Sequence, residues 1–353
     1  MAIELDNLHY SFREIDGYNK PFNFVFGPRE PGKTTMMWMS KIYNNWKKNF
    51  KPWLIMTRSS VEINEAFISS IFDTNINKFT DDNVSPEYTK TSFKDGIVDI
   101  KINGKLFFRI VSLNIDLRRI KLAVLKNIAG VFMDEYIIDR STGEKYLKKE
   151  AEKIKEAYTT WRREADGILK MYFVANGYSL YNPLFVYWKV DINKLKKGEF
   201  YVGDNFVIHW CTLNPLLKEK LLKENPLYKF DEDYMDYALN GGVMNDKNIR
   251  LGTLPKNYHM RFVFRIAGKN LAVYQNQDIF ADDDRFFIKC EKSVSMKRQI
   301  FAIDIGEMVD RTILLSSEEK FRLNSLISAF RKRLIVFEDV NSYYLFEEIY
   351  RQL

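Results

Sequence analysis

Short runs of aromatic and β-branched residues alternate with amphipathic stretches through the first half of the chain. The runs that predict buried strands are residues 22–26, 53–57, 128–133 and 169–175. Residues 34–46 and 147–161 carry apolar side chains at steps of three and four, which predicts helices with one apolar face. Residues 97–102 and 106–111 flank Asn103-Gly104, a dipeptide that favours a two-residue hairpin turn. Strands that alternate with helices predict an α/β fold with a mostly parallel sheet.

The pattern changes after about Trp210. Residues 216–222 and 231–239 show short helical spacings, and Asn240-Gly241-Gly242 ends this stretch as a break. From about Arg250 the chain becomes hairpin-like, with further strands and two late helices. We therefore expect a first domain at 1–210, a helical linker at 211–249 and a small α+β domain at 250–353.

Composition and charge exclude several classes of protein. The chain has 353 residues with 54 Lys and Arg against 47 Asp and Glu, and its net charge of +7 favours a polyanionic partner. No run approaches the roughly 18 apolar residues of a membrane-spanning helix, and the acidic start does not resemble a secretory signal. Cys211 and Cys290 stand far apart, which argues against a Cys-cluster zinc site or a disulfide framework and fits a reducing compartment. We expect no membrane partner.

Residues 27–34 match the pattern G-x-x-x-x-G-K-[ST] of a phosphate-binding loop at every fixed position. The two glycines let backbone N–H groups turn toward phosphate oxygens. Lys33 supplies a positive charge to the phosphates, and the Thr34 hydroxyl ligates Mg²⁺. The predicted nucleotide-binding residues are Gly27, Arg29, Gly32, Lys33, Thr34 and Thr35. The sequence thus predicts ATP and Mg²⁺ as cofactors; the alternative is a Gly/Pro turn that only spells the pattern.

A pair of carboxylates, Asp134 and Glu135, directly follows the strand predicted at 128–133. The carboxyl ends of buried parallel strands form the edge where such sheets bind ligands. We assign Asp134 to Mg²⁺ together with Thr34, and Glu135 to the general base that activates water. The alternative is an acidic strand end that faces solvent.

Two further polar residues have candidate catalytic roles. Asn176 ends the strand predicted at 169–175, where it can reach the γ-phosphate or the attacking water; alternatively it caps a turn before Gly177. Arg162 ends the helix predicted at 147–161 and can stabilise transition-state charge in its own or a neighbouring subunit. Alternatively Arg162 only complements the helix dipole.

Taken together, these segments resemble the DNA-packaging ATPases of phi-29-like small tailed phages. The residues that carry the resemblance are 23–34, 131–137, 161–163, 175–177 and 182–185, in an order and spacing that agree across roughly residues 20–190. Beyond that, the similarity thins to the hairpin at 261–273. The loop and the acidic pair are common to many ring ATPases. The Asn-Pro segment at 182–183 and the hairpin before the acidic pair are the features that restrict the resemblance to this one family.

The resemblance implies a P-loop ATPase of the ASCE class. It would act as a homo-oligomeric, pentameric ring in the host cytoplasm, transiently docked on the portal of a prohead, and would drive double-stranded DNA inward. Arg162 resembles the arginine finger supplied to the neighbouring subunit, with Arg163 as a rival. The basic and polar residues at the places of DNA-contacting pore loops are Arg118, Arg119, Lys121, Arg140, Ser141, Thr142 and Lys145. Such contacts would be to phosphates, whereas the alternative is solvated surface charge.

The same resemblance implies a vestigial RNase H-like nuclease domain at the C-terminus. Larger terminases carry a nuclease that needs carboxylates around two metal ions. Residues 261–267 hold no carboxylate where a nuclease of that fold begins its metal site, so we expect a docking domain that does not cut. In some relatives this domain meets a structural RNA on the prohead.

Two other functions fit part of the sequence. A different P-loop DNA-dependent ATPase, such as a helicase or a repair loader, would share the loop and the acidic pair, but no segment interleaves aromatic and basic residues as a single-strand platform would. A nucleotide-gated assembly protein would hold ATP without turnover, and Glu135 argues against it because a pure switch needs no base.

Overall fold

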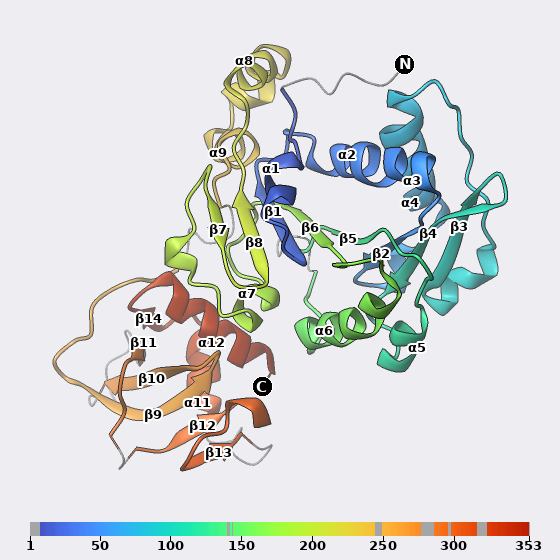
Figure 1. Ribbon diagram of the computed structural model, residues 1–353. Helices are drawn as coiled ribbons and strands as arrows, with labels where there is room; N and C mark the ends of the chain where they lie inside the picture. Colours follow the sequence, from blue (N-terminus) through green and yellow to red (C-terminus); the bar gives the residue numbers. More distant parts are fainter. Residues whose placement is uncertain are drawn as a thin grey trace. The chain divides into compact units, whose positions relative to one another are not determined.

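The computed structural model describes residues 8–139, 142, 144–243, 249–276, 286–295, 298–315 and 323–352. Its chain forms two compact units (Figure 1). Unit 1 comprises Met1–Leu180 and Leu195–Asn245, and unit 2 comprises Tyr181–Lys194 and Asp246–Leu353. Each unit has its own sheet and its own hydrophobic core.

Unit 1 is built on an eight-stranded sheet in the order β3-β4-β2-β5-β6-β1-β8-β7. Its strands are β1 (Phe22–Gly27), β2 (Trp53–Thr57), β3 (Ile97–Ile102), β4 (Lys105–Ser112), β5 (Gly130–Asp134), β6 (Met171–Asn176), β7 (Phe200–Val202) and β8 (Phe206–Trp210). The six inner strands from β4 to β8 pair in parallel, and the two edge strands β3 and β7 pair antiparallel. This confirms the predicted mostly parallel α/β sheet.

The hairpin predicted around Asn103-Gly104 forms between β3 and β4. Both turn residues have positive φ, 51° at Asn103 and 73° at Gly104, as a two-residue hairpin turn of this twist requires. The sequence analysis named no strand at β8, although β8 pairs in parallel with β1 along its whole length. The pattern change placed at about Trp210 is in fact the end of this last parallel strand.

Helices cover both faces of this sheet (Figure 1). They are α1 (Arg13–Gly17), α2 (Lys33–Met36), α3 (Asn44–Asn49), α4 (Glu65–Ser70), α5 (Leu117–Leu122) and α6 (Glu150–Trp161). On one face Trp38 packs on Phe132, and on the other Tyr158 of α6 packs on Phe22. Among the described residues, none of the helices has the length and apolar character needed to cross a membrane.

The helix predicted at 34–46 is not α-helical throughout. Its middle, Met37–Tyr43, is a π-helix between α2 and α3. The Ser40 hydroxyl donates to the Met36 carbonyl at 2.5 Å, and such a side-chain bond competes with the regular backbone ladder. Apolar spacing predicted the buried face of this helix but carried no sign of the wider turn.

Most of the expected linker at 211–249 belongs to unit 1, up to residue 245. Helices α8 (Pro215–Glu224) and α9 (Glu232–Asn240) form where the sequence predicts them. Their apolar side chains share one core cluster with Tyr178, which lies just beyond β6. The segment is therefore an integral part of the first unit and differs from the separate linker that we expected.

Unit 2 contains a six-stranded mixed sheet in the order β13-β12-β9-β10-β11-β14. Its strands are β9 (Tyr258–Ile266), β10 (Lys269–Asn276), β11 (Phe286–Glu291), β12 (Ile300–Ala302), β13 (Thr312–Leu314) and β14 (Ile335–Phe337). Helices α11 (Asn324–Arg331) and α12 (Val340–Gln352) bury Leu326, Ala329 and Phe346 in the core formed with β9, β10 and β11. The predicted hairpin and the two late helices are present in this α+β unit.

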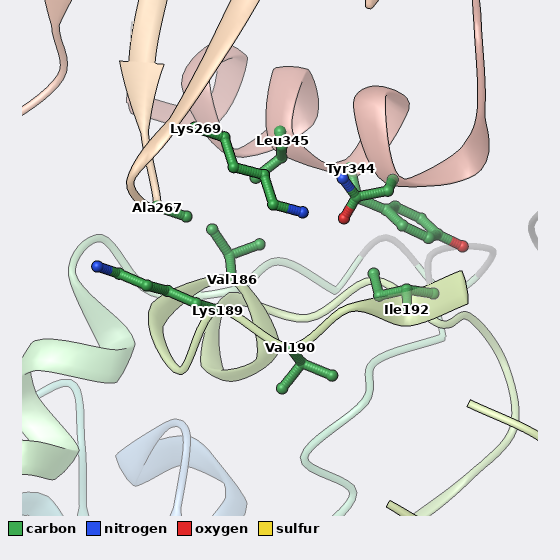
Figure 2. A pocket seen from close by; sticks show the side chains of 9 residues that line it. Val186, Lys189, Val190, Ile192, Ala267, Lys269, Tyr344 and Leu345 are labelled. Carbon is green, nitrogen blue, oxygen red and sulfur yellow. The ribbon is translucent and has the colours of Figure 1, made fainter. Parts of the chain in front are cut away.

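Residues 181–194, which we expected in the first domain, belong to unit 2. They carry helix α7 (Pro183–Tyr187), and Tyr181 stacks on Tyr344 of α12 with ring centroids 5.6 Å apart. Figure 2 shows the small cleft where this segment meets the rest of unit 2; its lining residues are Val186, Lys189, Val190, Ile192, Ala267, Lys269, Asn341, Tyr344 and Leu345. The cleft holds about 10 Å³, room for about one water molecule, so it is a packing seam rather than a ligand pocket.

Strand β8 of unit 1 carries a histidine that stays neutral in the fold. Phe200 stacks on His209 with ring centroids 3.9 Å apart, and the Tyr10 hydroxyl lies 2.9 Å from His209 Nδ1. Burial lowers the pKa of His209 to about 4.

We expect unit 1 to lose stability as the pH falls from 7 to 5. The unfolded chain binds a proton at His209 below about pH 6.5, whereas the folded chain does not until about pH 4, so acid favours unfolding. Because the ring is only half-buried, we expect a loss of about 1 to 2 kcal/mol. Urea denaturation at pH 7 and pH 5 measures it, and His209→Gln is the control that should remove most of this pH dependence. An equal loss in the variant would show that other groups carry the effect.

Candidate nucleotide-binding site

The phosphate-binding loop joins the carboxyl end of β1 to helix α2, and two glycines give it its path. Gly27 has φ of 148°, and a Cβ atom there would lie 2.4 Å from the Cys211 carbonyl oxygen. Gly32 has φ of 73° and immediately precedes α2; a Cβ atom there would lie 3.1 Å from the His9 ring. Backbone N–H groups at the start of such a helix point toward an anion. Both positions therefore favour glycine, as the sequence pattern of a phosphate-binding loop predicts.

Lys33 is directed into this loop. Its side chain is buried, and Nζ donates to the Pro28 carbonyl and, at 3.4 Å, to Asn176 Oδ1. Burial lowers the pKa of Lys33, and the charge of Asp134 is among the influences that oppose this shift. The sequence prediction for Lys33 and Asn176 thus has a geometric basis, since both side chains meet at the end of the sheet.

Three neighbouring strands end at the same place. In the order β5-β6-β1, Asp134 ends β5, Asn176 ends β6 and Gly27 ends β1. The Thr34 hydroxyl donates to Asp134 Oδ1 at 3.2 Å. A hydroxyl and a carboxylate beside a phosphate loop form a donor set suited to Mg²⁺, which prefers oxygen ligands and keeps substrate phosphates in its shell. Burial, and next the charge of Glu135, raise the pKa of Asp134 to about 7.

Glu135 stands directly after this cluster in the left-handed conformation, with φ of 52°. Its backbone N–H donates to Asp134 Oδ1 at 3.0 Å. Glu135 is exposed as a whole, but partial desolvation of its carboxyl group, followed by the charge of Glu144, raises the pKa of Glu135. A carboxylate with a raised pKa is a better proton acceptor near neutral pH, which is the property that a general base needs.

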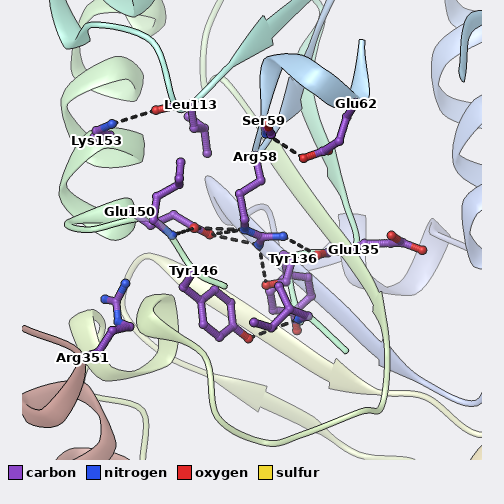
Figure 3. A network of polar contacts seen from close by, with 12 residues as sticks. Arg58, Ser59, Glu62, Leu113, Glu135, Tyr136, Tyr146, Glu150, Lys153 and Arg351 are labelled. Atoms are coloured by element: carbon purple, nitrogen blue, oxygen red, sulfur yellow. Dashed lines mark hydrogen bonds and ion pairs between the residues drawn. The ribbon is translucent and has the colours of Figure 1, made fainter. Parts of the chain in front are cut away.

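A buried ion pair holds the backbone around Glu135, and the sequence analysis missed it. Arg58, the residue after β2, contacts both carboxylate oxygens of Glu150 through Nε and Nη2 at 3.0 Å. The same guanidinium donates to the carbonyl oxygens of Glu135 and Tyr136 at 3.2 Å and 3.1 Å. Figure 3 shows this network, with the Glu135 side chain extending away from the guanidinium. The only sequence signal is a charged residue at a strand end; nothing there shows that Glu150 is buried.

We expect Arg58→Met and Glu150→Leu each to lower the free energy of unfolding by about 3 to 5 kcal/mol. Glu150 has no exposed side-chain surface and Arg58 only 10%, so either change leaves a buried charge without its partner. The double variant Arg58→Met with Glu150→Leu should recover most of the loss, because it removes both charges. Urea denaturation of the four proteins measures the cycle, and additive losses in the double variant would contradict it.

Comparison with known proteins decides the family. The family model of the Podovirus DNA encapsidation protein (Gp16) matches residues 5–353. The chain belongs to this family. Comparison with curated protein sequences finds no match.

Two solved structures share the fold of this chain over nearly its full length. One is the bacteriophage Phi-29 viral genome packaging motor assembly, with 19% identity, a TM-score of 0.63, and coverage of 97% of this chain and 99% of that chain. The other is the Phi-28 gp11 DNA packaging motor, with 14% identity, a TM-score of 0.59, and coverage of 97% of both chains. These findings confirm the resemblance to phage DNA-packaging proteins noted from the sequence.

Two predicted nucleotide contacts, Thr35 and Arg29, are engaged with other parts of unit 1. The Thr35 hydroxyl donates at 2.9 Å to Oδ1 of Asn75, which lies in the π-helix Ile71–Ile76. The Arg29 side chain is exposed, and its backbone N–H donates to the Ala238 carbonyl at 3.0 Å. The structure therefore groups Gly27, Gly32, Lys33 and Thr34 most tightly at the sheet edge and leaves Arg29 and Thr35 at its margin.

Arg162 lies near the amino ends of the sheet strands, whereas its own phosphate loop lies at their carboxyl ends. It follows α6, whose Tyr158 ring packs on Phe22, the first residue of β1, with centroids 4.7 Å apart. Strand β1 then rises for 6 residues, about 20 Å, to the loop. Arg162 and Arg163 are both exposed, so either guanidinium is available to another molecule but not to its own nucleotide site.

The predicted DNA-contacting residues differ in how free they are. Arg119 pairs with Asp95 at 3.6 Å, and both side chains are exposed. Lys121 is half-buried and its ammonium lies 2.8 Å from Glu156. Lys145 is exposed, whereas Arg140 and Ser141 lie outside the described residues.

Proposed function

We propose that this protein is an ATPase that drives double-stranded viral DNA into a preformed prohead. One observation carries the proposal: Lys33 and the Thr34–Asp134 pair stand together at the end of three parallel strands, in a chain that belongs to a DNA encapsidation family. This arrangement suits ATP with Mg²⁺, and the energy of its hydrolysis would power translocation.

Each residue of the site has a role in this proposal. Lys33 and the loop N–H groups bind the phosphates, and Thr34 and Asp134 hold Mg²⁺, which neutralises developing charge when it is bound. Glu135 accepts a proton from the attacking water, and Asn176 orients that water or the γ-phosphate. A nucleotide-gated assembly protein binds ATP without hydrolysing it and needs no residue that activates water. The roles of Glu135 and Asn176 toward the attacking water therefore distinguish an ATPase from such a protein.

We propose a homo-oligomeric ring, a pentamer when assembled, in which Arg162 completes the site of the neighbouring subunit. The exposed position of Arg162 near the amino ends of the sheet strands supports this role. Arg119, Lys121, Arg140 and Lys145 remain the candidates for contact with the DNA backbone. Lys121 would first have to leave its ion pair with Glu156.

For unit 2 we propose a docking role with a non-cleaving, RNase H-like fold. Strand β9 holds no Asp or Glu, and the carboxylate of Glu307 accepts from the Gly268 N–H and lies 4.0 Å from Arg265. These features argue against a two-metal nuclease site in this unit; a portal or a prohead RNA is the docking partner that we propose for it. The protein would work in the host cytoplasm, attached transiently to the prohead.

The test is ATP hydrolysis as a function of protein concentration, with and without linear double-stranded DNA, at low and moderate salt. We expect turnover to rise more steeply than linearly with protein, and duplex of any sequence to stimulate it more at low salt. A tailed duplex tests the helicase alternative, because a translocase of this kind should not separate strands. Turnover that is linear in protein and indifferent to DNA and portal would contradict the motor.

A further inference from the structure

The loop at 27–34 contains a carboxylate, Glu30, whose negative charge would repel a phosphate bound to that loop. Glu30 lies two residues before Gly32, and its charge is among the influences that raise the pKa of Lys33 against the effect of burial. Glu30 therefore lies within the electrostatic reach of the amine that should bind the phosphates. A carboxylate free to approach that amine would both repel a polyphosphate and compete with it.

In the structure this carboxylate is held by a tyrosine. The Tyr228 hydroxyl donates to Glu30 Oε1 at 2.9 Å. The Tyr228 side chain is 2% exposed, and its ring stacks on Tyr234 with centroids 5.8 Å apart. Lys33 donates instead to the Pro28 carbonyl and to Asn176. Burial, and then the bond to Glu30, raise the pKa of Tyr228 to about 12, so the hydroxyl keeps its proton at neutral pH.

The segment that carries Tyr228 is itself fixed to the loop. The Arg29 N–H donates to the Ala238 carbonyl at 3.0 Å, and a Cβ atom at Gly241 would lie 3.0 Å from Pro28 Cδ. Three successive loop residues thus contact the segment from α8 to Gly241, and Tyr228 occupies a defined position relative to Glu30.

We propose that Tyr228 is a positioning residue for nucleotide binding, which holds the Glu30 carboxylate away from the phosphate cradle. The hydroxyl donates a hydrogen bond to the Glu30 carboxylate and so keeps that carboxylate from pairing with Lys33. Lys33 then stays available for phosphate. The inference rests on the proposed binding of ATP. In this proposal, the segment from α8 to Gly241 controls the affinity of unit 1 for nucleotide.

Calorimetric titration of the full chain with ATP-γ-S and with ADP tests this inference. Tyr228→Phe should weaken ATP-γ-S binding about five- to tenfold, since bonds to charged groups are among the stronger ones, and should weaken ADP binding less. Glu30→Gln should bind at least as tightly as the wild type. The double variant Tyr228→Phe with Glu30→Gln should match Glu30→Gln alone, because the charge that Tyr228 restrains is gone.

Two variants separate this role from a merely structural one. Glu30→Asp keeps the charge but is one methylene too short for the tyrosine, so it should weaken ATP-γ-S binding as Tyr228→Phe does, without any change in the core. Tyr274→Phe removes a similar phenol–carboxylate bond, to Glu291 in unit 2, and should leave binding unchanged.

A double variant as weak as Tyr228→Phe, or unchanged binding in both Tyr228→Phe and Glu30→Asp, would overturn the role of Tyr228. In those cases the wild type still binds ATP-γ-S and the proposed function stands. Absence of ATP-γ-S binding in the wild type would overturn the nucleotide site itself, and this inference with it.

Discussion

Replacement of Glu135 by glutamine is expected to reduce ATP turnover by about 10²- to 10⁴-fold while nucleotide binding is kept. Glutamine has nearly the same shape but cannot accept the proton of the attacking water. Neither the bond from Lys33 to Asn176 nor the pairing of Thr34 with Asp134 involves the Glu135 side chain, so affinity should change little. Steady-state hydrolysis in the presence of DNA, together with titration of ATP-γ-S, measures both quantities.

Glu144→Gln is a matched control for this prediction. Partial desolvation of the carboxyl group is the main cause of the raised pKa of Glu135, and the charge of Glu144 adds to it. Removal of that charge should lower the pKa of Glu135 and move the acid limb of the pH–rate profile to lower pH, with the maximum rate within about fivefold of the wild type. Full turnover by Glu135→Gln would show that another group activates the water.

Arg162→Ala is expected to reduce turnover of the assembled protein by about 10³-fold or more and to leave ATP binding unchanged. Arg162 follows a helix that packs on the first residue of β1, at the opposite end of that strand from the loop, so its effect must come through a neighbouring subunit. Lys33→Ala should be inactive for a different reason, because it lacks the phosphate-binding amine. The two defects lie in different parts of a shared site.

Mixing these two inactive variants therefore tests action between subunits. In a mixed ring, a Lys33→Ala subunit supplies Arg162 to the intact loop of an Arg162→Ala neighbour, and turnover should return in part. Arg163→Ala alone should keep its turnover and serves as the control. No recovery on mixing would contradict a trans role, and loss of turnover in Arg163→Ala would transfer that role to Arg163.

The separation of these roles follows from sheet topology rather than from sequence spacing. Arg162 and Asn176 are 14 positions apart along the chain. Strand β6 nevertheless brings Asn176 to the carboxyl ends of the strands, beside the phosphate loop, while Arg162 stays near their amino ends. The sequence left open whether Arg162 acts within its own subunit, and the position of the helix that precedes it argues for a neighbour. Arg58 shows the opposite case, since no local pattern connects it with Glu150, which lies 92 positions away.

The sequence alone predicted four of the six parallel strands of unit 1, the hairpin of β3 and β4, the pattern of a phosphate loop at 27–34 and the acidic pair at Asp134 and Glu135. These features depend on local requirements: apolar periodicity, positive φ at glycine, and polar residues at strand ends. Only the tertiary structure decided that residues 211–245 complete unit 1, that residues 181–194 join unit 2, and that Tyr228 meets Glu30. Contacts of this kind depend on which surfaces remain to be buried once the sheets have formed, and a pattern along the chain does not record them.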